Sequence, residues 1–348
     1  MSRDTSADAL SSVAESVDKL RSIVLVMICE RDAEGATCDE VEVALSMRHQ
    51  TASARVNELM EAGKISDSGV RRRTRSGRKA IVWVAPCDGN VSLGSPLKWV
   101  GSKKWLAPRL RDLYAPHRGR RLVEPFVGGM NVALALRPAD ALLCDVNPHL
   151  INFYRRLRDS RPFEIEMRSD ERLYYAYRDC FNQLTRSGAA ETATAAELFY
   201  YLNKTGFNGV CRFNASGEFN VPFGKRKNVE YKRDFSEYAT ALRGWQLSCA
   251  PFGTQNLRAD DFVYADPPYD GTFVDYSAGG FNWEQQRALA IWLSHHTGPV
   301  VASNSSSERV LDLYRGLGFD VQLAEAPRSV SCDGNRAPVM EMLAVKIC

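Results

Sequence analysis

The chain has 348 residues, a hydrophobic fraction of 45%, a charged fraction of 25% and a formal net charge of +3. This length favours two domains, the composition is that of a globular protein, and no apolar run is long enough to cross a bilayer. The polar start lacks the pattern of a secretion signal, and the nine dispersed cysteines fit neither a disulfide framework nor a metal site. We therefore expect a cytoplasmic protein without membrane contact, bound metal or an obligate protein partner.

The first part of the chain has the pattern of a small helical domain with a hairpin. Residues 1–12 are polar and are expected to be disordered, and apolar residues then recur at helical spacing over 13–30. Residues 37–40 form a capping box that opens a second helix, and a third helix is expected over 49–62, before Gly63. An arginine-rich stretch, a Ser76-Gly77 turn and the β-rich residues 80–84 follow, which predicts a basic hairpin.

Three helices and a basic hairpin over residues 13–86 resemble the winged helix-turn-helix family. The resemblance implies that the third helix enters the major groove of DNA and that the hairpin contacts phosphate. It assigns three arginines of the hairpin to DNA contact, Arg73, Arg75 and Arg78. We expect the hairpin to anchor the protein on DNA without sequence preference; docking of another protein or a purely structural role is the alternative.

Residues 87–95 are rich in Gly, Pro, Asn and Asp and are expected to be a linker, so residues 96–348 form a second domain. In that domain β-like runs at 122–123, 141–144, 262–264 and 300–302 alternate with helical patterns. The alternation predicts an α/β fold with a mostly parallel sheet and helices on both faces. The segment between the second and third runs is too long for a simple crossover, so we expect a helical and hairpin insert at about 155–245 that recognises the target.

The clearest chemical signal is the tetrapeptide Asp266-Pro267-Pro268-Tyr269, which ends a β-run. Prolines stop the strand, so Asp266 and Tyr269 are expected at the edge of the sheet where α/β proteins bind ligands. The exocyclic amine of adenine is a poor nucleophile, and a carboxylate together with a proline-flanked carbonyl can accept both of its hydrogens. An aromatic ring can stack on a base flipped out of the duplex. We therefore predict Asp266, Pro267 and Tyr269 as the catalytic residues; an ordinary strand-to-loop turn is the alternative.

The tetrapeptide and three further segments resemble the Dam-type, alpha-group DNA adenine-N6 methyltransferase family. Residues 96–103 are similar to the segment that opens its catalytic domain, 122–129 to its cofactor loop and 143–148 to its second acidic motif. The resemblance covers about residues 96–345. It implies a Rossmann-like, S-adenosylmethionine-dependent methyltransferase sheet with an inserted target-recognition subdomain. The chain departs from the family pattern at Val100, Ser102 and Met130-Asn131, where smaller residues are usual.

The cofactor implied by the resemblance is S-adenosylmethionine, which carries a sulfonium, an ammonium and a ribose diol. Acidic groups at strand ends suit these cations, and Asp145 is suited to accept hydrogen bonds from the ribose hydroxyls. The residues expected to bind the cofactor are Trp99, Lys103, Glu124, Phe126, Gly128, Asp145 and Asp266.

Residues 201–225 mix aromatic, Asn, Gly and basic side chains around an expected turn at Ala215-Ser216-Gly217. This stretch is similar to the recognition hairpin of Dam enzymes, which methylate adenine in GATC. By that resemblance the residues at or beside the bases are Lys98, Asn208, Val210, Arg212 and Pro222, and those near phosphate are Lys225 and Arg226. An ordinary hairpin in which Arg212 pairs with Glu218 is the alternative.

Two further segments follow the tetrapeptide. Phe273 and Tyr276 are expected in a loop that closes over the flipped base or simply packs, and the Ser-Asn-rich residues 303–307 are interpreted as a helix cap. We thus expect an adenine-specific enzyme that acts on double-stranded DNA. The alternatives are a DNA-binding regulator with an inactive methyltransferase fold, a cytosine-N4 methyltransferase and, more remotely, an enzyme acting on RNA.

Overall fold

The computed structural model describes residues 20–29, 31, 34–85, 93–270, 281–326 and 339–347. The chain separates into two compact units, Met1–Ser92 and Leu93–Cys348. Residues 1–12, most of the expected linker at 87–95, and the loop with Phe273 and Tyr276 lie outside the described residues. No helix in the described part of the chain is both long and apolar enough to span a membrane.

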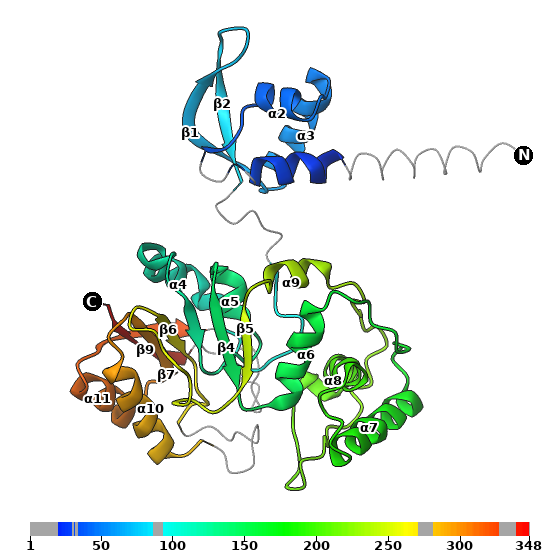
Figure 1. Cartoon of the computed structure of the whole chain (residues 1–348), viewed down its shortest axis with the longest axis vertical. Coiled ribbons are helices and arrows are strands. Elements are labelled where there is room, and N and C mark those ends of the chain that lie inside the picture. Colours follow the sequence, from blue (N-terminus) through cyan, green and yellow to red (C-terminus); the bar gives the residue numbers. More distant parts are fainter. Residues whose placement is uncertain are drawn as a thin grey trace, which may run out of the picture. The chain divides into compact units, whose positions relative to one another are not determined.

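The first unit contains helical residues 20–29, the helices α2 (Cys38–Ala44) and α3 (His49–Glu61), and an antiparallel hairpin of β1 (Ser66–Arg73) and β2 (Lys79–Val84) (Figure 1). The predicted capping box is confirmed, since the Thr37 hydroxyl accepts from the Glu40 N–H and the Glu40 carboxylate from the Thr37 N–H, at 3.2 and 2.8 Å. Gly63 follows α3 with a φ of 65°, as expected for a glycine that ends a helix. Apolar side chains of the helices, among them Val24, Val41 and Val56, form one core, against which Trp83 of β2 packs.

The second unit is built on a seven-stranded sheet with the strand order β5-β4-β3-β6-β7-β9-β8. Its strands are β3 (Leu122–Glu124), β4 (Ala141–Asp145), β5 (Gln246–Cys249), β6 (Phe262–Ala265), β7 (Val300–Ser305), β8 (Asp320–Ala326) and β9 (Val339–Lys346). The strands from β5 to β7 are parallel, whereas β9 runs antiparallel between β7 and β8. The predicted α/β fold with a mostly parallel sheet is therefore confirmed.

Helices cover both faces of this sheet, because its strands are apolar on both sides. Successive residues point to opposite faces, so that Leu142 and Leu143 belong to two different cores, one on each face. The helices α6 and α8 lie on one side of the sheet and α10 and α11 on the other (Figure 1). The helices of this unit are α4 (Ala107–Tyr114), α5 (Asn131–Leu136), α6 (Pro148–Arg158), α7 (Glu171–Arg186), α8 (Ala193–Thr205), α9 (Ser236–Ala241), α10 (Trp283–His295) and α11 (Glu308–Gly316), with short 3-10 turns at Lys104–Leu106, Ala115–His117 and Phe207–Gly209.

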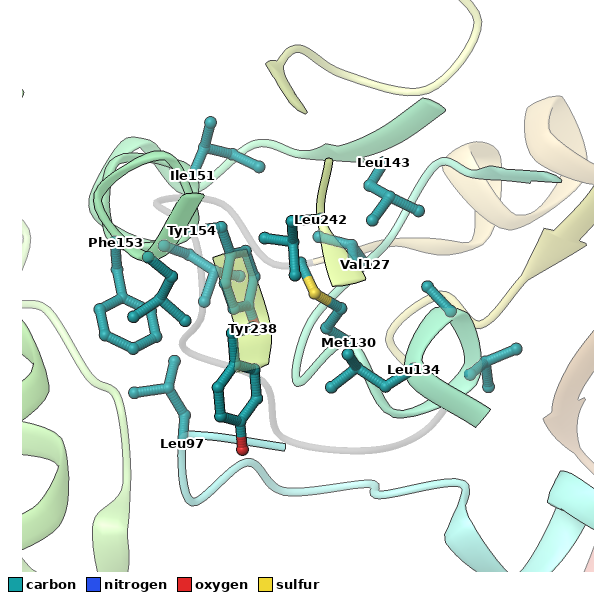
Figure 2. Close-up of a cluster of buried hydrophobic side chains, with 14 of the residues drawn as sticks. Leu97, Val127, Met130, Leu134, Leu143, Ile151, Phe153, Tyr154, Tyr238 and Leu242 are labelled. Atoms are coloured by element: carbon teal, nitrogen blue, oxygen red, sulfur yellow. The ribbon is translucent and has the colours of Figure 1, made fainter. Parts of the chain in front are cut away.

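The larger core holds the loops that follow the strands in place. Figure 2 shows Val127 and Met130 of the loop after β3 packed with Tyr154 of α6, and Leu97 near Tyr238. The Tyr154 hydroxyl donates a hydrogen bond to the carbonyl of Gly128 at 2.5 Å. The Tyr238 hydroxyl donates to the carbonyl of Gly94 at 2.8 Å. Buried tyrosines thus fix both the loop after β3 and the segment that opens this unit.

Candidate active site

The strand order places a ligand-binding edge between β3 and β6. These strands are neighbours in the sheet but far apart in sequence, so the connections from them lead to opposite sides. In such sheets ligands bind beyond the carboxyl ends of the strands at this switch point. Three carboxylates lie at these ends: Glu124 closes β3, Asp145 closes the adjacent β4, and Asp266 follows β6 directly.

Asp266 is anchored through one of its two carboxylate oxygens. The Ser303 hydroxyl donates to Oδ1 at 2.8 Å, and Nζ of Lys103 lies 3.1 Å from the same oxygen. Nζ of Lys103 also donates to the carbonyl of Gly101 at 3.1 Å, which ties it to the opening segment. Among the described residues these contacts all reach Oδ1, so Oδ2 keeps its capacity to accept a hydrogen bond from a substrate.

The loop after Asp266 is held by side chains from α10 and β7. Nε2 of Gln286 donates to the carbonyl of Pro268 at 2.8 Å, and Nδ2 of Asn304 donates to Oε1 of Gln286, also at 2.8 Å. The interpretation of residues 303–307 as a helix cap holds for position alone: Ser307 is the N-cap residue of α11 but makes no side-chain capping bond. Ser303 and Asn304 instead hold the loop. Within the described part of the chain the carbonyl of Pro267 accepts no hydrogen bond, so it too can serve a substrate.

Tyr269 lies beside this carboxylate and is tied to a residue that the sequence analysis missed. Its hydroxyl donates to Oε2 of Glu341 at 2.6 Å, and its ring lies under Lys103, with Nζ 4.7 Å from the ring centroid. Burial, together with the charges of Asp266 and Glu341, raises the pKa of Tyr269 well above its usual range. The hydroxyl therefore stays protonated and acts as a donor.

Glu124 is a buried carboxyl group with an unsatisfied oxygen. Its side chain is 2% exposed, and Oε1 has no hydrogen-bond partner among the described residues. Burial raises the pKa of Glu124 well above its usual range, and the nearby Asp266 adds to this effect. A buried acceptor without a partner is rare and costly, so this position suits a ligand that brings a cation or a hydrogen-bond donor.

The loop between β3 and α5 is a glycine turn closed by Asp145. Gly128 has a φ of 43°, and a side chain there would place Cβ 2.7 Å from Nε1 of Trp99. The Gly128 N–H donates to Oδ2 of Asp145 at 3.1 Å, and the Asn147 N–H donates to Oδ1 at 3.0 Å. Burial raises the pKa of Asp145 to about 6. Oδ2 of Asp145 therefore holds this loop and Oδ1 holds the turn after β4, and the carboxylate keeps capacity to accept from a ligand.

Phe126 adds an aromatic wall beside this loop. Its ring centroid lies 5.6 Å from that of Phe281 and 5.8 Å from that of Phe252. These rings belong to segments that follow other strands, so the wall borders the same edge of the sheet. All residues predicted for the cofactor thus have positions at or near one edge, which Trp99 and Lys103 reach from the opening segment through their contacts with Gly128 and Asp266.

The opening segment also reaches the insert between β4 and β5. The Lys98 N–H donates to Oδ1 of Asn203 at 2.9 Å, and Nδ2 of Asn203 donates to the carbonyls of Lys98 and Gly209, at 2.9 and 3.1 Å. A side chain at Gly209 would bring Cβ within 2.4 Å of Cβ of Lys98. Burial, together with the charges of Arg226 and Lys204, lowers the pKa of Lys98 to about 8. Asn203, which was not predicted, thus joins these two segments, together with the bond from Nζ of Lys98 to the carbonyl of Lys204 at 2.7 Å.

The predicted hairpin turn at 215–217 is present, bounded by an antiparallel bridge between Phe213 and Phe219. Arg212 is exposed, and its Nε donates to Oδ1 of Asn220 at 2.8 Å. Glu218 instead pairs with Arg186, so the alternative pairing of Arg212 with Glu218 is wrong. The hairpin thus presents a guanidinium whose hydrogen-bond partners, among the described residues, are the uncharged side chain and carbonyl of Asn220.

Other predicted recognition residues surround this hairpin. Asn208 is exposed and has a φ of 53°, Val210 is half-buried, and Pro222, Lys225 and Arg226 are exposed. Phe207, at 53% exposure, is a large apolar side chain on this surface that the sequence analysis missed. The signal that could have identified Phe207 from the sequence was its position within a run of aromatic, Asn and Gly residues.

The arginines of the first unit differ in their pairing. Arg75 forms ion pairs with Asp39 at 2.9 Å and with Glu42 at 3.0 Å. Arg73 and Arg78 are exposed, and within the described residues neither forms an ion pair. The structure therefore leaves Arg73 and Arg78 available for phosphate, whereas Arg75 would first have to exchange its carboxylate partners. Nowhere in the described ranges do His, Cys, Asp and Glu side chains gather in a group that could hold a metal ion.

The parallel sheet, the carboxylates at its switch point and the Asp266–Tyr269 loop define an amino-group methyltransferase. A family model described as D12 class N6 adenine-specific DNA methyltransferase matches residues 99–329. The chain belongs to this family, and it is an adenine-specific DNA methyltransferase.

Relatives with this activity in their names are similar over most of their length. The Retron Ec67 DNA adenine methylase of Escherichia coli is 35% identical over 263 residues, which cover 72% of this chain and 90% of the relative. The DNA adenine methylases of Vibrio cholerae and of Escherichia coli K12 are each 33% identical over 72% of this chain and 94% of their own length. Among solved structures, a precorrin-6y C5,15-methyltransferase from Geobacter metallireducens superposes with a TM-score of 0.30 at 9% identity, over 69% of this chain and 87% of that chain.

Proposed function

We propose that the enzyme transfers a methyl group from S-adenosylmethionine to N6 of an adenine that has been flipped out of duplex DNA, within the sequence GATC. The observation that carries the proposal is the one-sided anchoring of Asp266. Its Oδ1 is engaged by Ser303 and Lys103, which leaves Oδ2 and the carbonyl of Pro267 as two acceptors beside the ring of Tyr269.

Two hydrogens on N6 match two acceptors. Hydrogen bonds to Oδ2 of Asp266 and to the Pro267 carbonyl would favour the pyramidal nitrogen whose lone pair is free to attack. Transfer would form a bond between the methyl carbon and N6 as the carbon–sulfur bond breaks and the sulfonium becomes a neutral thioether. The proton lost from N6 would pass to solvent by way of its hydrogen bond to Oδ2 of Asp266. Stacking on Tyr269 would hold the base, and flipping is required because N6 is inaccessible inside a duplex.

The residues at the switch point fit S-adenosylmethionine. When bound, it would supply a methyl group made electrophilic by the sulfonium. Glu124, whose buried Oε1 lacks a partner, is suited to the ammonium group, and the free acceptor capacity of Asp145 is suited to the ribose hydroxyls. Trp99, Gly128 and Phe126 would form the walls around it.

The exposed hairpin supports recognition of GATC. Arg212 can exchange its bonds with Asn220 for a bidentate contact to guanine, and the apolar surfaces of Val210 and Pro222 suit a thymine methyl group. Lys98 and Asn208 would complete the base contacts, and Lys225 and Arg226 would lie near phosphate. The exposed ring of Phe207 suits stacking on a base.

The first unit is proposed to be a winged helix that anchors the enzyme on DNA without sequence preference. Its support is the hairpin of β1 and β2, on which Arg73 and Arg78 are exposed and form no ion pair with any residue that the structure describes. Residues 155–245 are proposed as the target-recognition insert, residues 87–95 as the linker, and the cytoplasm as the location.

In the test, the enzyme and methyl-labelled S-adenosylmethionine are incubated with three duplexes, which contain GATC, an altered site or no adenine. Label in N6-methyladenine from the GATC duplex alone supports the proposal, and Asp266→Ala must abolish it. Label in N4-methylcytosine, or equal label in the altered site, would refute the proposed base or sequence. Tight DNA binding without label would favour the inactive regulator.

A further inference from the structure

Glu341 reaches the active site from the antiparallel part of the sheet. Because β9 runs opposite to β7, the first residues of β9 lie where the parallel strands end. Glu341 pairs in register with Ser305, the last residue of β7. This topology brings the carboxylate of Glu341 to the edge that also holds Asp266.

One oxygen of Glu341 contacts two groups of the active site. Oε2 accepts the hydrogen bond from the Tyr269 hydroxyl at 2.6 Å and lies 3.7 Å from Nζ of Lys103. The same Nζ is 3.1 Å from Oδ1 of Asp266. The Lys103 side chain is 5% exposed, so its charge depends on these two carboxylates for stabilisation.

We propose that Glu341 is a positioning residue for methyl transfer, which fixes the ring of Tyr269 through its hydroxyl and holds the ammonium of Lys103 against Oδ1 of Asp266. The role of Tyr269 in this inference rests on the proposed stacking of the flipped adenine. Without Glu341 the Tyr269 hydroxyl loses this acceptor, and of the two carboxylates beside Lys103 only that of Asp266 remains. Displacement of a reacting group by about 1 Å can reduce a rate on the order of 100-fold, so a defect of this size is expected even though Glu341 does not touch the base.

The experiment measures single-turnover methylation at saturating S-adenosylmethionine, with the duplex that the wild-type enzyme methylates best. Glu341→Ala is expected to reduce the rate on the order of 100-fold, while the Kd values for DNA and cofactor stay within about threefold. Glu341→Gln should lose less, because its amide oxygen can still accept from the Tyr269 hydroxyl. Glu325→Gln is the matched control, since Glu325 is an exposed carboxylate on β8 that pairs in register with Met340.

A double-mutant cycle separates positioning from a general role in stability. Tyr269→Phe removes the same hydrogen bond, so Glu341→Ala should cost less in the Tyr269→Phe background than in the wild type. The proposal is overturned if Glu341→Ala keeps the wild-type rate, if the two effects multiply independently, or if the rate falls only as far as Tm and cofactor binding fall. Failure of the wild type on GATC would refute the proposed target alone, because the variants are then compared on the duplex that is methylated.

Discussion

Glu124 gives a prediction in which cofactor affinity and stability change in opposite directions. The substitution Glu124→Gln keeps the shape of the side chain, which is 2% exposed, and removes its ability to carry a charge. If this carboxylate binds the ammonium group of the cofactor, the substitution removes one charge-assisted hydrogen bond. Such bonds contribute about 1.5–3 kcal/mol, so the Kd for S-adenosylmethionine should rise roughly 10- to 150-fold.

The effect on stability follows from the raised pKa of Glu124. An acid whose pKa is higher in the folded state than in the unfolded state binds its proton more tightly when folded. Folding stability therefore falls as the pH rises from the unfolded pKa, about 4.3, through the folded pKa. Glu124→Gln removes this loss, so its Tm without cofactor at pH 8 should equal or exceed that of the wild type. Asp145, with a pKa of about 6, contributes in the same direction in both proteins.

The assay is titration calorimetry with S-adenosylmethionine at pH 8, in buffers of different ionisation enthalpy. The wild type should release protons on binding because Glu124 ionises as it meets the cation, and Glu124→Gln should release fewer. Glu325→Gln, on the exposed side of β8, serves as the control. An unchanged Kd for Glu124→Gln, or a Tm several degrees below that of the wild type, would refute the assignment.

Three further predictions concern catalysis, specificity and anchoring. Asp266→Ala should lower the single-turnover rate by about 10³-fold or more while DNA binding persists, since it removes an acceptor that acts on the reacting nitrogen; a rate within tenfold of wild type would contradict its catalytic role. Arg212→Ala should reduce discrimination at a guanine of GATC by about 1–3 kcal/mol, measured as the ratio of kcat/KM for cognate and altered duplexes, and an unchanged ratio would exclude base contact. Replacing Arg73 and Arg78 together by Ala should reduce the slope of log DNA affinity against log salt concentration by about two phosphate contacts, without changing the methylated site. The control Arg71→Ala, which removes an arginine already paired with Asp67, should change this slope less. Equal slopes for the double variant and the wild type would contradict the proposed anchor.

The sequence predicted the features that depend on neighbouring residues. The strands ending at Glu124 and Asp145 are short apolar runs followed by turn residues, and the capping box at Thr37 is a local pattern, so both were recognised. The Asp266 tetrapeptide was recognised because its chemistry is contained in four adjacent positions. The family match confirms the enzyme class that this tetrapeptide and the cofactor segments indicated.

Contacts between distant segments could not be predicted in the same way. Glu341 is one carboxylate in an ordinary strand pattern, and only the antiparallel pairing of β9 with β7 brings it to Tyr269. In the sequence Ser303 could be any polar residue before a helix. Only the pairing of β7 with β6 shows that it lies beside Asp266. The sequence likewise does not show that Arg75 is paired, because its partner Asp39 is 36 positions away.

The pairing of β9 orders the events by which this enzyme becomes active during synthesis. Among the described strands β8 pairs only with β9, so the ribosome must produce residues 339–346 before β8 can join the sheet and before the edge of β7 is covered. Until then β7 presents unpaired backbone groups, which favour association with other chains. The same late strand carries Glu341. A nascent chain that already contains the Asp266 tetrapeptide and every residue proposed to bind the cofactor would therefore still lack the carboxylate that holds Tyr269, and the loop after Asp266 would be completed only as the sheet closes.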